Sequence, residues 1–93
     1  MAEVAVHVVV DGRVQGVWFR AWTRQEANKL GLRGWVRNRR DGTVEAVLCG
    51  ENSVVDDMVQ RLHVGSPASR VDNVTVSPAN PPAEMAFVQK NTV

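Results

Sequence analysis

The sequence predicts an α+β fold in which two helices cover one face of a β-sheet. Three observations lead to this prediction. Several segments alternate apolar and polar residues with period two, two segments repeat apolar residues at helical spacing, and the segments follow one another as strand, helix, strand, strand, helix, strand. The chain has 93 residues, which is enough for one small core. We therefore expect a single domain over residues 1–93.

The first two predicted elements are a strand and a helix. Residues 4–10 are predicted to form a central strand, because valine stands at every even position and its branched side chain favours strands. Residues 21–30 are predicted to form a helix, and Gly31 follows where glycine commonly ends one. The apolar stripe of this helix consists of Phe19, Thr23, Ala27 and Leu30.

A β-hairpin and a second helix follow. Residues 32–39 and 43–49 alternate in the manner of strands, and the Asp41-Gly42 pair between them is a strong hairpin-turn signal. Residues 51–64 are predicted to form a helix with Asn52 or Ser53 as its N-cap. Its apolar positions recur at helical spacing and are Val55, Met58, Val59 and Leu62.

The last part of the chain predicts one further strand and a short terminal one. GSPAS at 65–69 interrupts the pattern, residues 70–77 alternate again, and a proline-rich connection leads to a short apolar segment at 85–89. The resulting order is βαββαβ, with a short fifth strand at an edge. This order predicts a ferredoxin-like sandwich, an antiparallel sheet with both helices on one face.

Composition and charge narrow the function classes. Eleven basic and 10 acidic residues give a net charge of +1, which provides no overall attraction to nucleic acid or to an anionic membrane. Cys49 is the only cysteine, which excludes an internal disulfide and favours a reducing setting. Neither a signal peptide nor an apolar run of the ~20 residues that span a membrane is visible. We expect a cytoplasmic monomer that binds neither nucleic acid nor a membrane.

The segment DGRVQGVWFR at 11–20 is the clearest candidate binding site. It joins a predicted strand to a predicted helix, where unpaired backbone N–H groups and the positive end of the helix dipole suit an anion. Gly12 and Gly16 permit positive φ, which would turn successive amides inward, and Arg20 can grip two phosphate oxygens. The spacing alone equally fits a tight turn with an exposed arginine, and it matches no dinucleotide or Walker motif.

Two strings resemble the signatures of the acylphosphatase family. GRVQGVWFR at 12–20 is similar to the first signature, and GWVRN at 34–38 is similar to the second. The similarity continues through DGTVEA at 41–46 and GSPASRVD at 65–72. The resemblance implies a ferredoxin-like enzyme that hydrolyses acyl phosphates to a carboxylate and inorganic phosphate. It also implies that no metal or other cofactor takes part and that phosphate is a product inhibitor.

The resemblance further implies roles for individual residues. Arg20 and Asn38 would be catalytic, with Arg20 on the phosphoryl group and Asn38 holding the attacking water. Members of the family often have a small residue or a cysteine at the position of Trp18, whose role is left open. The implied substrate-binding residues are Gly12, Arg13, Val14, Gln15, Gly16, Val17, Trp18, Phe19 and Arg20.

Two other function classes fit parts of the sequence. A non-catalytic ferredoxin-like module would use the same loop to bind a phosphorylated ligand or a protein, but it would not need Asn38. A nucleic-acid-binding sandwich would use tryptophans as stacking platforms beside basic residues. We instead expect Trp35 to pack in the core. The nearby arginines would raise the positive potential that attracts acidic substrates, and they are Arg37, Arg39 and Arg40.

His7, His63 and Cys49 carry no prediction of catalysis. Neither histidine has a cysteine or carboxylate partner at the spacing of metal ligands, which favours surface or capping roles. Cys49 lies within an alternating strand and is expected to be a packed thiol.

Overall fold

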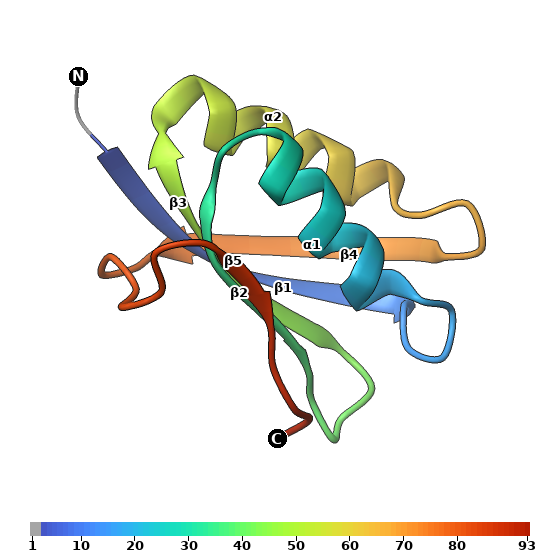
Figure 1. Cartoon of the computed structure of the whole chain (residues 1–93). Coiled ribbons are helices and arrows are strands. Elements are labelled where there is room, and N and C mark those ends of the chain that lie inside the picture. The colour runs from blue at the N-terminus through green and yellow to red at the C-terminus, as the bar shows by residue number, and fades with distance from the viewer. Residues whose placement is uncertain (1–2) are drawn as a thin grey trace.

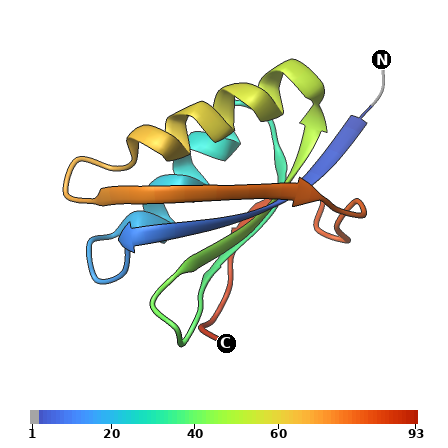
Figure 2. The same cartoon turned by 180° about the vertical axis from the view of Figure 1, so that it is seen from behind.

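The computed structural model describes residues 3–93 and places two helices on one face of a five-stranded sheet (Figure 1). The view from behind shows the other face of the sheet, which no helix covers in the described part of the chain (Figure 2). The predicted order and the two layers are confirmed. No helix within residues 3–93 is long and apolar enough to cross a membrane. The elements are β1 (Glu3–Arg13), α1 (Phe19–Lys29), β2 (Arg33–Asn38), β3 (Val44–Glu51), α2 (Asn52–Val64), β4 (Arg70–Pro78) and β5 (Phe87–Gln89).

The strands lie side by side in the order β4-β1-β3-β2-β5. β1 pairs antiparallel with β3 and β4, and β2 pairs antiparallel with β3, as the sequence predicted. The short fifth strand differs, because β5 runs parallel to β2 with Phe87 opposite Gly34. The connection 79–86 carries the chain from β4 at one edge of the sheet to β5 at the other. The parallel pairing of β5 with β2 makes the sheet mixed.

The core lies between the two helices and the sheet face that they cover. The stripes predicted from helical spacing supply it, although Leu30 and Val59 are only half-buried. On the sheet, alternate residues point to this core, and they include Val8, Val10, Val36, Ala46 and Leu48. The helices contribute Phe19, Ala27, Val55, Met58 and Leu62.

Trp35 does not pack in the core, and that prediction was wrong. Successive side chains of a strand point to opposite faces of the sheet, so the burial of Val36 against the helices puts Trp35 on the open face. There the guanidinium carbon of Arg37 lies 4.5 Å from the centre of the indole ring, and Lys90 Nζ lies 5.0 Å from it. Two cations next to the ring suit its negative face.

The end of α1 follows the prediction. Gly31 has a φ of +73°, and its N–H donates to the carbonyl of Asn28 at 3.1 Å. The N–H of Leu32 donates to the carbonyl of Ala27 at 3.0 Å. These two bonds form a Schellman motif with glycine in the left-handed position, which confirms that Gly31 ends the helix.

The start of α2 does not follow the prediction. Glu51, rather than Asn52 or Ser53, is the N-cap residue, and the helix begins at Asn52. Glu51 is also the last residue of β3, so the chain passes from an extended strand directly into the helix. The Ser53 hydroxyl donates to the Glu51 carboxylate at 3.1 Å and does not cap a backbone N–H.

The predicted turn between β2 and β3 is confirmed. The Asp41 carboxylate accepts hydrogen bonds from the backbone N–H and the hydroxyl of Thr43, at 3.0 and 2.6 Å. The backbone N–H of Gly42 donates to the carbonyl of Arg39 at 3.1 Å, which closes the turn. This hairpin fixes the end of β2, where Asn38 lies.

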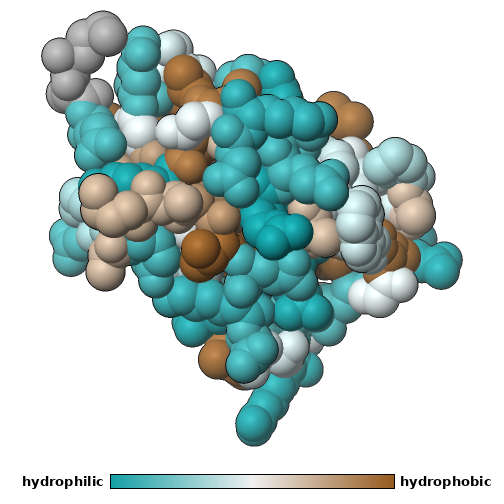
Figure 3. Space-filling view, in the orientation of Figure 1, coloured by the Kyte–Doolittle hydropathy of each residue, from teal (hydrophilic) through white to brown (hydrophobic). Residues whose placement is uncertain are grey.

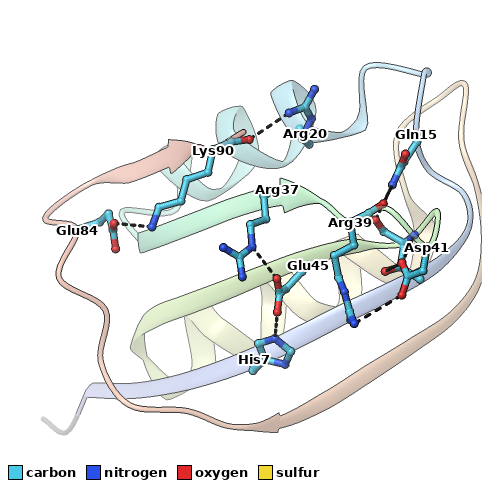
Figure 4. Close-up of polar contacts among 10 residues, drawn as sticks. His7, Gln15, Arg20, Arg37, Arg39, Asp41, Glu45, Glu84 and Lys90 are labelled. Atoms are coloured by element: carbon cyan, nitrogen blue, oxygen red, sulfur yellow. Dashed lines mark hydrogen bonds and ion pairs between the residues drawn. The ribbon is translucent and has the colours of Figure 1, made fainter. Parts of the chain in front are cut away.

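A charged cluster lies on the open face of the sheet (Figure 4). Glu45 of β3 lies 2.6 Å from Nε2 of His7 on β1 and accepts a hydrogen bond from Nε of Arg37 on β2 at 2.7 Å. Burial raises the pKa of Glu45, but the hydrogen bonds from His7 and Arg37 outweigh this effect, so that its pKa lies below the ordinary value of 4.5. Glu45 therefore links side chains of three neighbouring strands, with His7 and Arg37 as its two partners.

Alanine at Gly34 is expected to destabilise the sheet strongly. Gly34 has a φ of +139°, and a Cβ there would overlap the carbonyl oxygen of Val47 on β3. We expect Gly34→Ala to lower the free energy of unfolding by about 2–4 kcal/mol in urea titrations. Gly31→Ala is the matched control, because its φ is +73° but a Cβ meets no atom within 4 Å in the described structure beyond Gly31 and its two chain neighbours. It should cost only about 1 kcal/mol, and equal losses in the two variants would contradict this explanation.

Because the pKa of Glu45 is lowered in the folded state, acid should remove part of the stability of the protein. A carboxyl with a lower pKa in the folded state stabilises the fold above its unfolded pKa, near 4.5, and loses this effect as pH falls through the folded value. The free energy of unfolding should therefore fall more steeply between about pH 5 and pH 3 in the wild type than in Glu45→Gln. Asp56→Asn, at an exposed position on α2, is the control. Parallel profiles for the wild type and Glu45→Gln would refute the prediction.

Candidate active site

The loop between β1 and α1 turns sharply at two residues. Gly16 has a φ of +70°, and Trp18 has a φ of +64°, the only positive φ of a non-glycine residue within residues 3–93. This conformation costs glycine little, but it costs a residue with a Cβ about 1–2 kcal/mol. The loop thus has the curled backbone that its glycines predicted, and it holds strain at Trp18.

The N-terminus of α1 opens onto this loop. Trp18 is the N-cap residue and provides no side-chain cap, and the first turn contains no acidic residue in the described structure. The first N–H groups of a helix have no partner inside the helix, and the helix dipole is positive at this end. The start of α1 is therefore suited to an anion.

Arg20 is the second residue of α1 and is half-buried. Its Nη1 donates a hydrogen bond to the backbone carbonyl of Lys90, just after β5, at 3.1 Å (Figure 4). This bond holds the guanidinium between the helix and the edge of the sheet. A guanidinium has five N–H donors, so others remain for an anion.

The side-chain amide of Gln15 joins the loop to the β2–β3 hairpin (Figure 4). Its Nε2 donates to the backbone carbonyls of Arg39 and Thr43, both at 2.7 Å. An amide NH₂ group has two donors, so both are used. Because Arg39 directly follows Asn38, this contact holds the loop next to the end of β2. The sequence grouped Gln15 with the substrate-binding residues, and its side chain is engaged with the protein itself.

Asn38 carries an unused acceptor. It is the last residue of β2, and its backbone carbonyl accepts a hydrogen bond from the N–H of Val93 at 3.1 Å. The side-chain oxygen Oδ1 is buried and has no hydrogen-bond partner within residues 3–93. Burying a polar group without a partner costs about 1–3 kcal/mol, so such a group calls for a functional explanation.

A cavity of about 390 Å³ brings these parts together. Arg20 and Asn38 both line it, as do Arg24 and Gln89, which the sequence did not single out. Arg24 follows Arg20 by four positions on the helix, and this spacing was the signal that could have found it. Gln89 lies on β5, and no sequence signal places that strand beside β2. The loop residues in the cavity wall are Val14, Gly16, Trp18 and Phe19.

The rest of the predicted substrate-binding segment lies outside this wall. Gly12 and Arg13 are the last residues of β1, where a bulge precedes their pairing with β4. Val17 lines a separate groove against residues 66–68. The assignment of these residues to substrate binding stays a prediction.

Two of the three neighbouring arginines are paired with carboxylates. Arg37 binds Glu45, and Nη2 of Arg39 lies 3.5 Å from the Asp41 carboxylate. Their field at the cavity is therefore weaker than the number of arginines suggests. Attraction of acidic substrates by this cluster stays a prediction.

Cys49 and the histidines lie away from this cavity wall. Cys49 is buried in β3, as predicted for a packed thiol, and burial raises the pKa of its thiol. In the described part of the chain, residues 3–93, no group of three His, Cys, Asp or Glu side chains is arranged to hold a metal ion.

Comparison with known proteins gives consistent matches. Residues 6–89 match the family model for acylphosphatase. An acylphosphatase from Rhizorhabdus wittichii is 52% identical over 90 residues, which cover 97% of this chain and 91% of that protein. The structure of an acylphosphatase from Coxiella burnetii has a TM-score of 0.90 at 38% identity, covering 95% of this chain and 93% of that one. The Bacillus subtilis acylphosphatase has a TM-score of 0.89 at 36% identity, covering 94% and 98%.

Proposed function

The chain belongs to the acylphosphatase family and hydrolyses the carboxyl-phosphate bond of acyl phosphates, and we propose that Arg20, the loop amides and Asn38 carry out this reaction. Arg20 and the backbone N–H groups of the loop hold the phosphoryl group, while Asn38 holds the attacking water. One observation carries the proposal. The cavity that Arg20 lines is also lined by Asn38, whose buried Oδ1 has no partner in the described structure.

The leaving group explains why so few side chains suffice. It is a carboxylate, whose conjugate acid has a pKa of about 4 to 5, so it departs without a general acid. Phosphoryl transfer needs little covalent chemistry from the protein. The chain must therefore hold the attacking water in position and stabilise the negative charge of the phosphoryl group.

The start of α1 and Arg20 stabilise the negative charge of the phosphoryl group. The transition state of phosphoryl transfer spreads negative charge over the equatorial oxygens, which oriented N–H groups and a guanidinium stabilise. Arg20 lies in the first turn of α1, whose N–H groups face the same loop. Inorganic phosphate would use the same donors, so we propose it as a product inhibitor.

Asn38 positions the attacking water. Its Oδ1 can accept a hydrogen bond from water and its NH₂ group can donate one, but an amide is no base near neutral pH. The proton of the water therefore leaves to a phosphate oxygen of the substrate or to solvent. A non-catalytic phosphate-binding module would require the loop and Arg20 but would have no use for the unpartnered oxygen of Asn38.

We further propose that the whole chain, residues 1–93, is one domain that works as a cytoplasmic monomer without a metal or other cofactor, and binds neither nucleic acid nor a membrane. The extent of the family match supports the first part, since it covers residues 6–89. The net charge of +1 supports the expected lack of binding to nucleic acid and membranes, and the single, buried Cys49 supports a reducing, cytoplasmic setting.

Asn38→Ala should separate rate from binding. Without the amide, water is no longer held in line, so kcat with benzoyl phosphate should fall at least about 100-fold. The Kd of inorganic phosphate, measured by calorimetry, should change less than about threefold, because the loop and Arg20 remain. Asn80→Ala, at an exposed asparagine, is the control and should keep both values. A large loss of phosphate affinity in Asn38→Ala would count against the water-holding role.

Arg20→Gln should impair both properties. The guanidinium contributes charged hydrogen bonds to the ground state and the transition state alike. We expect the Kd of inorganic phosphate to rise about tenfold or more, and kcat/KM for benzoyl phosphate to fall about 100-fold or more. Arg70→Gln removes an exposed arginine on β4 that pairs with Asp72, and it should change neither. Unchanged phosphate affinity in Arg20→Gln would remove Arg20 from the binding site.

A further inference from the structure

A second groove lies next to the candidate active site. Its volume is about 340 Å³, and it runs between the loop that precedes α1, the first turns of α1 and the turn at 66–69. At the right-hand edge of Figure 3, where these two loops lie in Figure 1, hydrophobic residues lie among pale and hydrophilic ones. The residues that line the groove are Val17, Trp18, Trp22, Ser66, Pro67 and Ala68.

Ser66 is the polar residue of this apolar groove. Only 6% of the residue is exposed, and its hydroxyl is buried without a hydrogen-bond partner within residues 3–93. The surrounding turn is already formed, because the backbone carbonyl of Ser66 accepts hydrogen bonds from both the N–H and the hydroxyl of Ser69, at 3.0 and 2.8 Å. A buried hydroxyl without a partner destabilises the fold, and a hydrogen bond from a bound ligand would offset that cost.

Trp18 connects this groove to the active-site cavity. Its side chain lines both of them, and 68% of the residue is exposed. The backbone of Trp18 has a φ of +64°, a conformation that glycine or asparagine would adopt at lower cost. A large, exposed aromatic residue in a strained conformation between two cavities suggests a role in binding.

We propose that the groove binds the acyl group of the substrate, with Trp18 as its main contact and Ser66 as a hydrogen-bonding partner. The inference rests on the proposed function, which places the phosphoryl group at Arg20. In phosphoryl transfer the attacking and leaving oxygens lie roughly in line through phosphorus. A leaving group opposite a water on Asn38 is directed away from β2, and Trp18 joins the loop side of the cavity to the groove.

The chemistry of the groove defines the preferred acyl group. Two indole rings and the side chains of Val17 and Pro67 favour a flat, apolar group. The hydroxyl of Ser66 favours a hydrogen-bonding atom on that group, since it can donate or accept. The preferred substrate class is therefore an aromatic acyl phosphate that carries a polar ring substituent, rather than a short aliphatic one.

Trp18→Ala tests the groove through a ratio of two substrates. Benzoyl phosphate offers a ring, whereas acetyl phosphate offers one methyl group. We expect kcat/KM for benzoyl phosphate divided by kcat/KM for acetyl phosphate to fall about tenfold, because only the ring loses apolar contact. An unchanged ratio, or an equal fall for both substrates, would overturn the proposal.

Ala68→Trp repeats the test without touching the loop at 12–20. Ala68 is exposed and lines only the groove, so a bulky side chain there should fill the groove and lower the same ratio about tenfold. An unchanged ratio in Ala68→Trp would also overturn the proposal. Met85→Ala removes an apolar side chain that is 86% exposed and lies outside the groove, and its ratio should equal that of the wild type.

Ser66→Ala tests the polar end of the groove. The variant should fold well, because it removes a buried hydroxyl that has no partner in the described structure. We expect it to lower kcat/KM for 4-hydroxybenzoyl phosphate relative to benzoyl phosphate about fivefold. No change would remove Ser66 from the site. The substrate ratios test the groove separately from the catalytic roles. Asn38→Ala and Arg20→Gln test the catalytic roles on a single substrate, so either proposal can be refuted while the other stands.

Discussion

The side-chain amide of Gln15 is the contact on which the active site depends. It uses both of its N–H donors on the backbone carbonyls of Arg39 and Thr43, at 2.7 Å each. The loop that faces the start of α1 is thereby held against the end of β2, and Arg20 and Asn38 come to line one cavity. Each bond stabilises the fold by only about 1 kcal/mol. Their value for function lies in fixing the distance between the phosphoryl group and the water, because small misplacements of reacting groups cost large factors in rate.

Most of the fold could be predicted from the sequence because its signals are local. Valine at alternate positions marks β1, and Gly31 marks the end of α1. Three features depend on contacts between distant segments and were missed or misjudged. A tryptophan can lie on either face of a strand, and only the burial of Val36 shows that Trp35 lies on the open face. The N-cap residue of α2 is Glu51, rather than Asn52 or Ser53, because β3 runs directly into the helix. The parallel pairing of β5 follows from a long connection that no periodicity describes.

The site residues that belong to a sequence motif could be predicted, whereas those that only the fold brings together could not. The strings that contain Arg20 and Asn38 are visible in the sequence, and the resemblance gave both residues their roles. Gln89 and Ser66 approach from segments far along the chain, so no spacing reveals them. The structure adds one observation of its own. Two buried side-chain oxygens, on Asn38 and Ser66, have no partner in residues 3–93, and each of these two residues lines one of two cavities that share Trp18.

The central claim is that Arg20 and Asn38 act on one phosphoryl group from two sides. A crystal structure of the protein with orthovanadate, which mimics the five-coordinate phosphorus, tests this most directly. We expect the vanadate at the start of α1, with the Arg20 guanidinium and the loop amides on its equatorial oxygens and Asn38 Oδ1 on an apical oxygen. Vanadate bound on the open face of the sheet, or bound in the cavity while Asn38 Oδ1 stays without a partner, would contradict the account.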